Sequence, residues 1–350
     1  MGQIPRHHRQ ILVPEIGASG QESIQKAHVM VVGCGALGSF VIDQLARAGV
    51  GTLTLVDRDI VEATNLQRQT LFTMEDVECA KPKADAAAAR VRAIDPGLMV
   101  HSVVEHYDSE NALDLLRGVD LVIDGLDNFP SRYLLNDACV HEGVPWIHGG
   151  VVGTRGTSMV VLPGTTPCLR CLFPQPPSPG STPTCDTAGV LAPAVATVSS
   201  HQVLQAFKIL TGARSAIDHS LVSWDFWNDR LTRVDVGGSR DLSCPCCMLG
   251  LYEYLKTPVG SATVLCGRGA VQVVPGTKSR GFDLSGLLER LGSHGRFNID
   301  SGRLRGVLHS ISGDSQDTLE LTVFDDGRAI ITGTTDPDRA RGIYDRFIGH

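Results

Sequence analysis

One short segment constrains the fold of this chain more than any other. The apolar run Val29 to Val32 leads directly into Gly33-Cys-Gly-Ala-Leu-Gly38, and Ser39 to Gly49 then has the periodicity of a helix. In a strand, G-x-G-x-x-G and helix unit, the first glycine allows a tight turn, the second lets backbone approach a phosphate, and the third packs helix against strand. Amides at the helix start face the anion. We therefore predict a nucleotide site lined by Gly33, Gly35, Ala36 and Gly38.

A second predicted strand, Thr52 to Asp57, follows and ends in an acid. Asp57 is placed to accept hydrogen bonds from ribose hydroxyls. A polar cluster continues from Asp57 to Gln69, beside the glycine loop. Within this cluster we expect Asn65, Arg68 and Gln69 to face the phosphates, although an isolated arginine can equally be a solvated surface charge.

Two further polar groups belong to the same edge of the predicted sheet. Lys83 follows Lys81-Pro82 at a predicted helix start, and Asp124-Gly-Leu-Asp-Asn128 follows an apolar strand. Ligands of open α/β sheets bind at the carboxyl ends of the strands. Asp127 can hold Mg²⁺ through a carboxylate oxygen.

The order of elements predicts a doubly wound α/β fold. Up to about residue 160 strands alternate with helices, which indicates a mostly parallel sheet; the expected strands are 29 to 32, 52 to 56, 98 to 104, 119 to 123 and 145 to 147. Residues 174 to 184 are proline-rich and predict a loop, for which we suggest the role of a lid. The nearly uncharged stretch Thr187 to Leu210 predicts a buried helix that stops at Gly212.

After residue 250 the predicted pattern of elements changes to short strands with few helices. We expect residues 1–250 to form one domain and residues 251–350 a small α+β domain, with a helix near 283 to 291, a hairpin at Asp325-Asp-Gly327 and a last helix. Its role does not follow from the residues. Carrier docking or dimer support is preferred to a rhodanese domain, because Val271 to Val274 continues as strand after Cys266 where a rhodanese needs a helix.

Cysteine spacing indicates a metal site. Cys168-x-x-Cys171 and Cys244-x-x-Cys247 are two pairs at the spacing of a zinc knuckle, and together they supply four ligands for a structural Zn²⁺. Cys246 leaves open which thiol of the second pair binds. We expect Cys34, Cys79 and Cys139 to be small buried side chains.

Composition excludes several classes of protein. The chain has 350 residues, 42% of them hydrophobic and 20% charged, and a formal net charge of -7. Without long basic runs it has little electrostatic support for nucleic-acid or acidic-membrane binding. There is no run of membrane-spanning length and no apolar signal core at the N-terminus, so we expect a cytoplasmic protein.

These motifs together resemble the ThiF/MoeB family, the adenylyltransferases of sulfur carrier proteins, which are related to ubiquitin-activating enzymes. The resemblance covers roughly residues 6 to 250. It implies ATP at the glycine loop, and adenylation of the C-terminal glycine of a small β-grasp carrier of the ThiS or MoaD kind, which ends in Gly-Gly. It also implies a homodimer, with a cysteine desulfurase or a rhodanese as sulfur donor. The pathways implied are thiamine, molybdopterin and tRNA thiolation.

The resemblance also implies roles for individual residues. Asp57 would contact ribose, Arg68 and Lys83 the phosphates, and Asp127 the magnesium ion, with Asn65 at the phosphate end and Asn128 beside Asp127. His8-Arg9-Gln-Ile11 resembles a motif whose arginine reaches the ATP of the other subunit, so Arg9 would act in trans. Two departures are Ala36, in place of a frequent glycine, and Glu78-Cys79-Ala80, which lengthens the stretch before Lys83 and makes Lys81 the substitute candidate.

Cys185 follows the proline-rich loop and precedes a predicted helix, whose N-terminal amides would favour its thiolate. The resemblance implies either a nucleophile that forms a covalent adduct with the carrier or a bystander. Two other readings of the whole chain remain open here. A nicotinamide dehydrogenase would share the glycine loop and Asp57, and a zinc-stabilised scaffold could bind a carrier without catalysis. The absence of a G-x-x-x-x-G-K-[ST] motif disfavours a P-loop ATPase.

Overall fold

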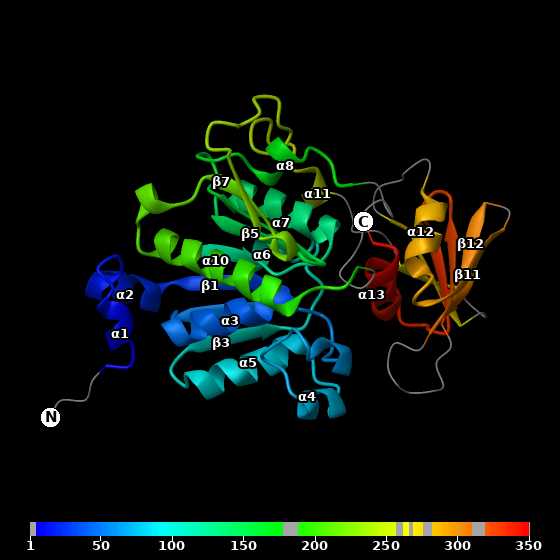
Figure 1. The fold of residues 1–350 in the computed structure, drawn as a ribbon, viewed down its shortest axis with the longest axis horizontal. Coiled ribbons are helices and arrows are strands. Elements are labelled where there is room, and N and C mark those ends of the chain that lie inside the picture. The colour runs from blue at the N-terminus through cyan, green and yellow to red at the C-terminus, as the bar shows by residue number, and fades with distance from the viewer. Residues whose placement is uncertain are drawn as a thin grey trace.

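A computed structural model describes residues 5–177, 188–256, 262–265, 269–275, 282–300, 302–309 and 319–349. Within these ranges the chain builds two sheets, one of eight strands and one of six. Figure 1 shows the two sheets side by side, with the strands of the second coloured from yellow to red. Among the described residues no helix has both the length and the apolar character that a membrane span requires.

The larger sheet has the strand order β3-β2-β1-β4-β5-β6-β7-β8. Pairing is parallel from β3 to β5 and antiparallel from β5 to β8. Its strands are β1 (His28–Val32), β2 (Thr52–Val56), β3 (Met99–Val103), β4 (Leu121–Asp124), β5 (Trp146–Val152), β6 (Arg155–Val161), β7 (Ser220–Asp225) and β8 (Arg230–Asp235). The apolar burial of β1, β2 and β4 is nearly continuous, as expected for parallel strands covered on both faces.

Helices cover both faces of this sheet. The helices of this part are α1 (His8–Ile11), α2 (Gly17–Lys26), α3 (Ala36–Ala48), α4 (Met74–Glu78), α5 (Lys83–Ile94), α6 (Ala112–Leu115), α7 (Phe129–Glu142), α8 (Leu169–Leu172), α10 (Ala192–Leu210) and α11 (Glu253–Lys256). One core holds the apolar sides of α3, α5 and α10, and a second holds those of α6, α7 and α8. The sheet is therefore doubly wound, as the sequence predicted.

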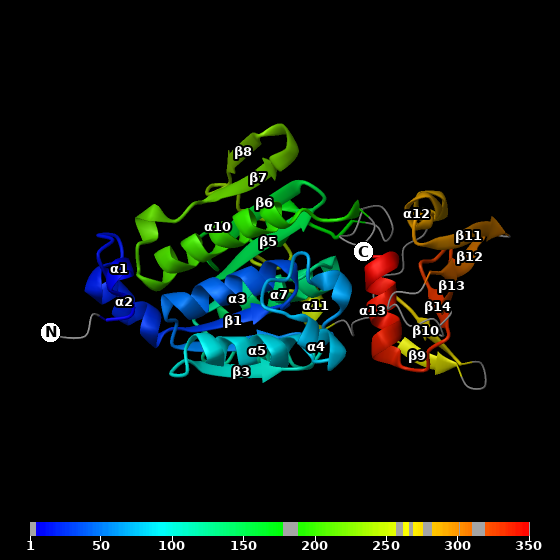
Figure 2. The ribbon, with the colours of Figure 1, turned by 60° about the horizontal axis from the view of Figure 1, so that its bottom comes forward.

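The smaller sheet is antiparallel, in the order β11-β12-β13-β14-β10-β9. Its elements are β9 (Ala262–Leu265), β10 (Ala270–Val273), α12 (Leu284–Leu291), β11 (Gly295–Asp300), β12 (Arg303–Leu308), β13 (Leu319–Phe324), β14 (Ala329–Thr332) and α13 (Pro337–Phe347). A separate apolar core joins the two helices to this sheet. Figure 2 shows α13, in red, on the side of this sheet that faces the larger one, as Figure 1 does.

Most predicted elements are confirmed, and the differences have physical reasons. The hairpin turns at Asp325 to Gly327, where Gly327 has a positive φ of 83°. The long helix α10 ends before Gly212 as predicted, but it begins at Ala192 and not at Thr187, because Val190 pairs with Gly153 and Leu191 is extended. The sequence missed β6, β7 and β8, and it expected Cys79 to be buried although it is exposed at the end of α4.

Candidate active site

The loop between β1 and α3 has the geometry of a phosphate cradle. Gly33 has a positive φ of 90°, and a Cβ added to Gly38 would lie 1.9 Å from the carbonyl oxygen of Gly33. At Gly35 the nearest contact of such a Cβ would be Gln69 Nε2, at 3.8 Å. Gly33 and Gly38 are therefore required for the turn and for packing. The free approach is at Gly35, directly before the first residue of α3, Ala36.

Asp57 connects this loop to the end of β2. Its Oδ2 accepts a hydrogen bond from the Cys34 N–H at 2.7 Å, and its Oδ1 accepts one from the Asp59 N–H at 2.8 Å. Burial raises the pKa of Asp57 to about 6, with Asp59 adding to the rise and Lys83 opposing it. The carboxylate is thus fixed beside the glycine loop, with its remaining lone pairs available to a ligand.

Lys83 lies in the same cluster. Its Nζ donates to Asp59 Oδ2 at 3.0 Å, and its side chain is 10% exposed. Burial acts against its charge, but Asp59 and Asp57 outweigh that effect and raise the pKa of Lys83. Lys81, the substitute candidate, instead donates to Asp76 at 3.2 Å. Of the two lysines, Lys83 is therefore the one that the structure brings to Asp57.

The predicted polar cluster forms a short 3-10 turn, Ala63–Asn65, and the residues after it. Asn65 is buried, and its Oδ1 caps the turn by accepting from the Glu62 N–H at 3.1 Å. Arg68 donates to the Thr64 carbonyl at 2.9 Å. Gln69 is buried against Gly35, and no hydrogen-bond partner for its Oε1 occurs among the described residues. The turn thus orders this segment beside the cradle.

Asp127 and Asn128 follow β4. Asn128 caps α7, because its Oδ1 accepts from the Ser131 N–H at 3.0 Å, and its Nδ2 donates to Asp127 Oδ1 at 3.3 Å. The charge of Asp127 contributes to the raised pKa of Lys83. Asp127 is therefore within electrostatic range of the Lys83 cluster, and a carboxylate in this place suits a hard cation such as Mg²⁺.

The sequence did not predict a buried cluster of charged side chains around Asp124, at the start of the loop that carries Asp127. Arg132 of α7 donates from Nε to Asp124 Oδ2 at 2.7 Å and from Nη2 to the Leu126 carbonyl at 2.6 Å. His148 of β5 pairs with the same Asp124 oxygen at 2.9 Å. Burial alone would raise the pKa of Asp124, but Arg132 and His148 lower it. A signal existed in the sequence, because an acid at the end of a buried strand needs a cationic partner.

One predicted residue, Arg9, does not lie at the glycine loop of its own chain. Arg9 is exposed on α1, and α1 lies at the opposite end of α3, where His7 is directly against Gly49. Since α3 has 13 residues, that end is about 20 Å from the glycine loop. Figures 1 and 2 both show α1 and α2 away from α13 and α4. Cys185, with most of the proline-rich loop and Cys266, lies outside the described residues.

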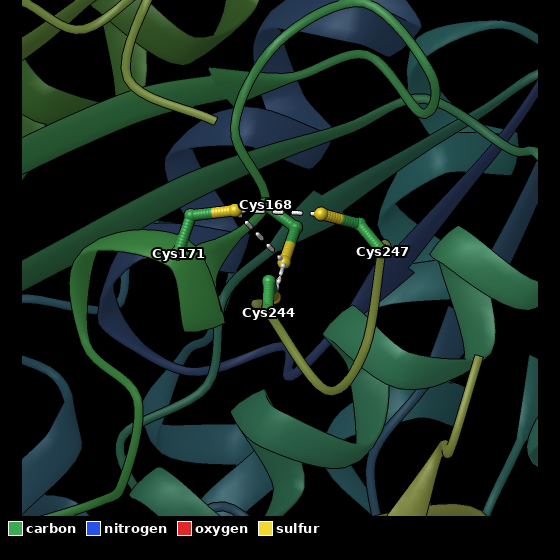
Figure 3. A group of neighbouring side chains, drawn as sticks. All are labelled: Cys168, Cys171, Cys244 and Cys247. Atoms are coloured by element: carbon green, nitrogen blue, oxygen red, sulfur yellow. Dashed lines mark hydrogen bonds between the residues drawn. The ribbon is translucent and has the colours of Figure 1, made fainter. Parts of the chain in front are cut away.

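The four predicted metal ligands lie together (Figure 3). The Sγ atoms are 3.9 Å apart for Cys168 and Cys171, 3.6 Å for Cys168 and Cys244, and 3.3 Å for Cys171 and Cys247. All four lie within 4.8 Å of one another. A tetrahedral Zn²⁺ with sulfur ligands at about 2.3 Å separates its sulfurs by about 3.8 Å, so the arrangement fits this ion.

Cys246 stands apart from the four. It is buried and accepts a hydrogen bond from Asn136 Nδ2 at 3.3 Å, while Cys247 contributes to the cluster. The question left open by the sequence is therefore decided in favour of Cys247 as the candidate ligand. Asn136 also accepts from the Leu169 N–H at 2.9 Å, which connects α7 to the first cysteine pair.

The fold and site define a class of protein: a doubly wound nucleotide-binding protein with a four-cysteine cluster in the core that holds α7 and α8. The model of the ThiF family matches residues 7–246, and the chain belongs to this family. Membership sets aside the nicotinamide dehydrogenase reading, since the resemblance to ThiF proteins predicted from the motifs is confirmed.

Individual relatives agree with the family. The chain is 39% identical over 347 residues to the sulfur carrier protein ThiS adenylyltransferase of Bacillus subtilis, covering 98% of this chain and 99% of that protein. It is 41% identical over 254 residues to the SAMP-activating enzyme E1 of Haloferax volcanii, covering 73% of this chain and 92% of that one. Among solved structures, Escherichia coli MccB with MccA-N7isoASN has a TM-score of 0.61 at 20% identity, over 71% of this chain and 75% of MccB. That last likeness concerns the fold alone.

Proposed function

We propose that this protein uses ATP to adenylate the C-terminal glycine of a small ubiquitin-like sulfur carrier, with release of pyrophosphate. The observation that carries the proposal is the joining of Asp57 and Lys83 to a glycine loop with free approach at Gly35, in a chain of the ThiF family. A ThiS-like carrier is the first candidate. The relationship to a ThiS adenylyltransferase extends over 98% of this chain, residues 251–350 included.

The reaction is argued from charge. A carboxylate oxygen of the carrier attacks the α-phosphorus of ATP and forms the acyl adenylate, and the bond to the β-phosphate oxygen breaks so that pyrophosphate leaves. Negative charge accumulates on phosphate oxygens, where fixed cations stabilise the transition state most. We assign this role to Lys83 and Arg68, and ribose binding to Asp57. In this step no side chain of the enzyme has to act as nucleophile.

Two metals are part of the proposal. Asp127 would hold Mg²⁺, which supplies positive charge to the phosphates when bound, and Asn128 would orient Asp127 through their hydrogen bond at 3.3 Å. The four cysteines would hold a structural Zn²⁺. Their fit to tetrahedral geometry supports zinc, and a site with four protein ligands leaves no open position for catalysis.

The remaining roles are proposals of the same kind. The enzyme works as a homodimer in which Arg9 reaches the partner's ATP, as its distance from its own glycine loop suggests. Residues 1–250 form the adenylating domain and residues 251–350 a second domain, although α11 packs against α7 in the core that α6 and α8 share. A cysteine desulfurase or a rhodanese supplies the sulfur. Cys185 either forms a covalent adduct with the carrier or has no role in transfer, which full sulfur transfer by Cys185→Ala would decide.

Carrier-dependent ATP–pyrophosphate exchange tests the function. Purified protein is assayed with a ThiS-like carrier, a MoaD-like carrier and a carrier lacking its terminal glycine. We expect exchange with the ThiS-like carrier, and its loss in Arg68→Ala and with the truncated carrier. If no Gly-Gly carrier supports exchange, the adenylation proposal is wrong and the zinc-stabilised scaffold replaces it.

A further inference from the structure

The last helix, α13, contacts the loop that follows β2. Arg58 Nη2 donates to Asp345 Oδ2 at 2.8 Å, and Arg346 Nη1 donates to Glu62 Oε2 at 3.1 Å. The Arg58 and Asp345 side chains are 17% and 19% exposed. The two ion pairs have opposite polarity, with the cation on the loop in one and on the helix in the other. Each side of this contact therefore presents one positive and one negative partner to the other.

This loop belongs to the candidate nucleotide site. Arg58 lies between Asp57 and Asp59 in the sequence, and Asp59 holds Lys83. Asp127 contributes to the electrostatics of both members of the pair: it favours the charge of Arg58 and opposes that of Asp345. The end of α13 is thus placed at the carboxyl edge of β2 and β4, on the ribose side of the glycine loop.

The second ion pair acts on the segment that carries Arg68. Glu62 caps the 3-10 turn Ala63–Asn65 with its side chain, and the same carboxylate oxygen that accepts from Arg346 also accepts from Thr64 Oγ1 at 3.3 Å. Because the Glu62 carboxylate accepts from the turn and from α13, it orders the turn and the residues that follow it. Docking of α13 and the position of the proposed phosphate contacts are in this way connected through one carboxylate.

Arg58 Nη1 and His106 Nε2 are buried and lack hydrogen-bond partners within the described residues. His106 lies on the loop after β3. His106 lies in the field of Arg58, of Arg341 from α13 and of Asp59, and burial followed by the two arginines lowers its pKa to about 3. The ring is therefore neutral. A buried Arg58 N–H donor and a neutral His106 ring nitrogen thus remain unsatisfied within the described residues at this contact, which marks it as a polar region.

We propose that α13 is part of the nucleotide site, with Asp345 as a positioning residue that holds Arg58 beside Asp59, the carboxylate that accepts from Lys83, so that docking of the C-terminal domain and ATP binding favour each other. The inference rests on the proposed function. Because coupling between two binding events is reciprocal, loss of the Asp345 charge weakens ATP binding, and bound ATP strengthens the docking of α13. Removing one partner of a largely buried ion pair also leaves the other charge uncompensated.

The experiment compares Asp345→Asn, which removes the charge at constant size, with Asp345→Glu, which keeps it. ATP affinity is measured by calorimetry without carrier, and KM and kcat by carrier-dependent exchange. We expect Asp345→Asn to weaken ATP binding and raise its KM about tenfold with kcat changed less than about twofold, and Asp345→Glu to restore most of the loss. The double variant Arg58→Gln with Asp345→Asn is expected to be no worse than Arg58→Gln alone.

A matched control lies in the same domain. Arg305 pairs with Glu320 at 3.3 Å on an exposed part of the smaller sheet, so Arg305→Ala removes an ion pair away from the contact and should leave ATP affinity unchanged. Wild-type affinity in a folded Asp345→Asn protein, or an effect on kcat alone, would overturn the inference. Failure of the proposed function has a different signature: no exchange with any carrier in the wild type, while ATP binding and its dependence on Asp345 persist.

Discussion

At the scale of single residues, Asp57 connects two loops before any nucleotide binds. Both of its oxygens accept backbone N–H groups, from Cys34 and from Asp59, so this residue, to which we assign ribose binding, also fixes the glycine loop to the end of β2. The acid was predictable, because it ends an apolar strand after G-x-G-x-x-G. The two backbone N–H groups that bind it were not predictable, because a backbone donor leaves no pattern in the sequence.

The raised pKa of Asp57 predicts a pH dependence. With a pKa of about 6, the residue is a carboxylate above pH 6 and is increasingly protonated below it. We expect the KM for ATP to rise about tenfold per pH unit below 6, as the fraction of carboxylate falls. Asp57→Asn should bind ATP weakly at every pH and show no such slope. The measurement is the pH profile of ATP–pyrophosphate exchange between pH 5 and 8.

Stability changes in the opposite direction, which separates weaker binding from unfolding. Since burial raises the folded-state pKa of Asp57, protonation favours the fold, and this contribution fades as pH rises from about 4 to about 6. Asp345, with a pKa of about 6 raised by burial and Asp127, titrates in the same window. Asp345→Asn is therefore profiled in parallel. A wild-type KM that stays constant from pH 7 to 5 would contradict the role of Asp57.

The glycines of the loop predict two different failures. In Gly35→Ala the new methyl meets only Gln69, at 3.8 Å, so the protein should fold normally while its KM for ATP rises at least about tenfold. In Gly38→Ala the methyl would lie 1.9 Å from the Gly33 carbonyl oxygen, which should cost about 3 kcal/mol of folding stability. Thermal unfolding and ATP titration of both variants distinguish the two. Unchanged ATP affinity in Gly35→Ala would show that Gly35 is not the point of approach.

At the scale of elements, the cysteine cluster joins α8 to the turn at residues 244–247, beneath α7. We expect Cys171→Ser to lose bound zinc and to lower the midpoint of thermal unfolding by about 5–10 °C, because metal binding contributes directly to folding. Metal content by mass spectrometry and calorimetry provide the readouts. Cys246→Ser is the matched control, since Cys246 accepts from Asn136 outside the four, and it should keep one zinc per chain.

The elements also show why part of the fold was predictable. The strand β1 and helix α3 have a strong local signal, an apolar run and a glycine loop. The strand β8 does not, because all its residues are exposed and its sequence Arg230 to Asp235 is mostly polar. The hairpin at Gly327 was found because a D-G turn needs a positive φ. Edge strands that bury no apolar face have no comparable pattern.

At the scale of the whole molecule, the site depends on parts that are far apart in the sequence. The contact of Arg58 with Asp345 spans 287 positions, and nothing local in either segment predicts it. Arg9 is the reverse case: its motif suggested a role at ATP, and the fold leaves it at the opposite end of α3 from its own glycine loop. A motif can therefore indicate chemistry without indicating which subunit performs it.

Mixed dimers test whether Arg9 acts in trans. Arg9→Ala and Arg68→Ala should each be inactive alone. In a mixed dimer one site combines an intact Arg68 with the partner's intact Arg9, so equimolar mixing after subunit exchange should restore about a quarter of wild-type exchange activity. Mixing that restores nothing, with heterodimers demonstrated by tagged subunits, would show that Arg9 does not act in trans.

The cysteine cluster has one more consequence. Cys168 and Cys244 lie 76 positions apart, so with zinc bound the chain between the two pairs, α10 included, becomes a closed ring. One proteolytic cut anywhere between Leu172 and Ser243 then opens the ring without dividing the particle, because each fragment keeps two of the four thiolates. The cut protein should migrate as one species until a chelator is added, after which the fragments remain together only by packing.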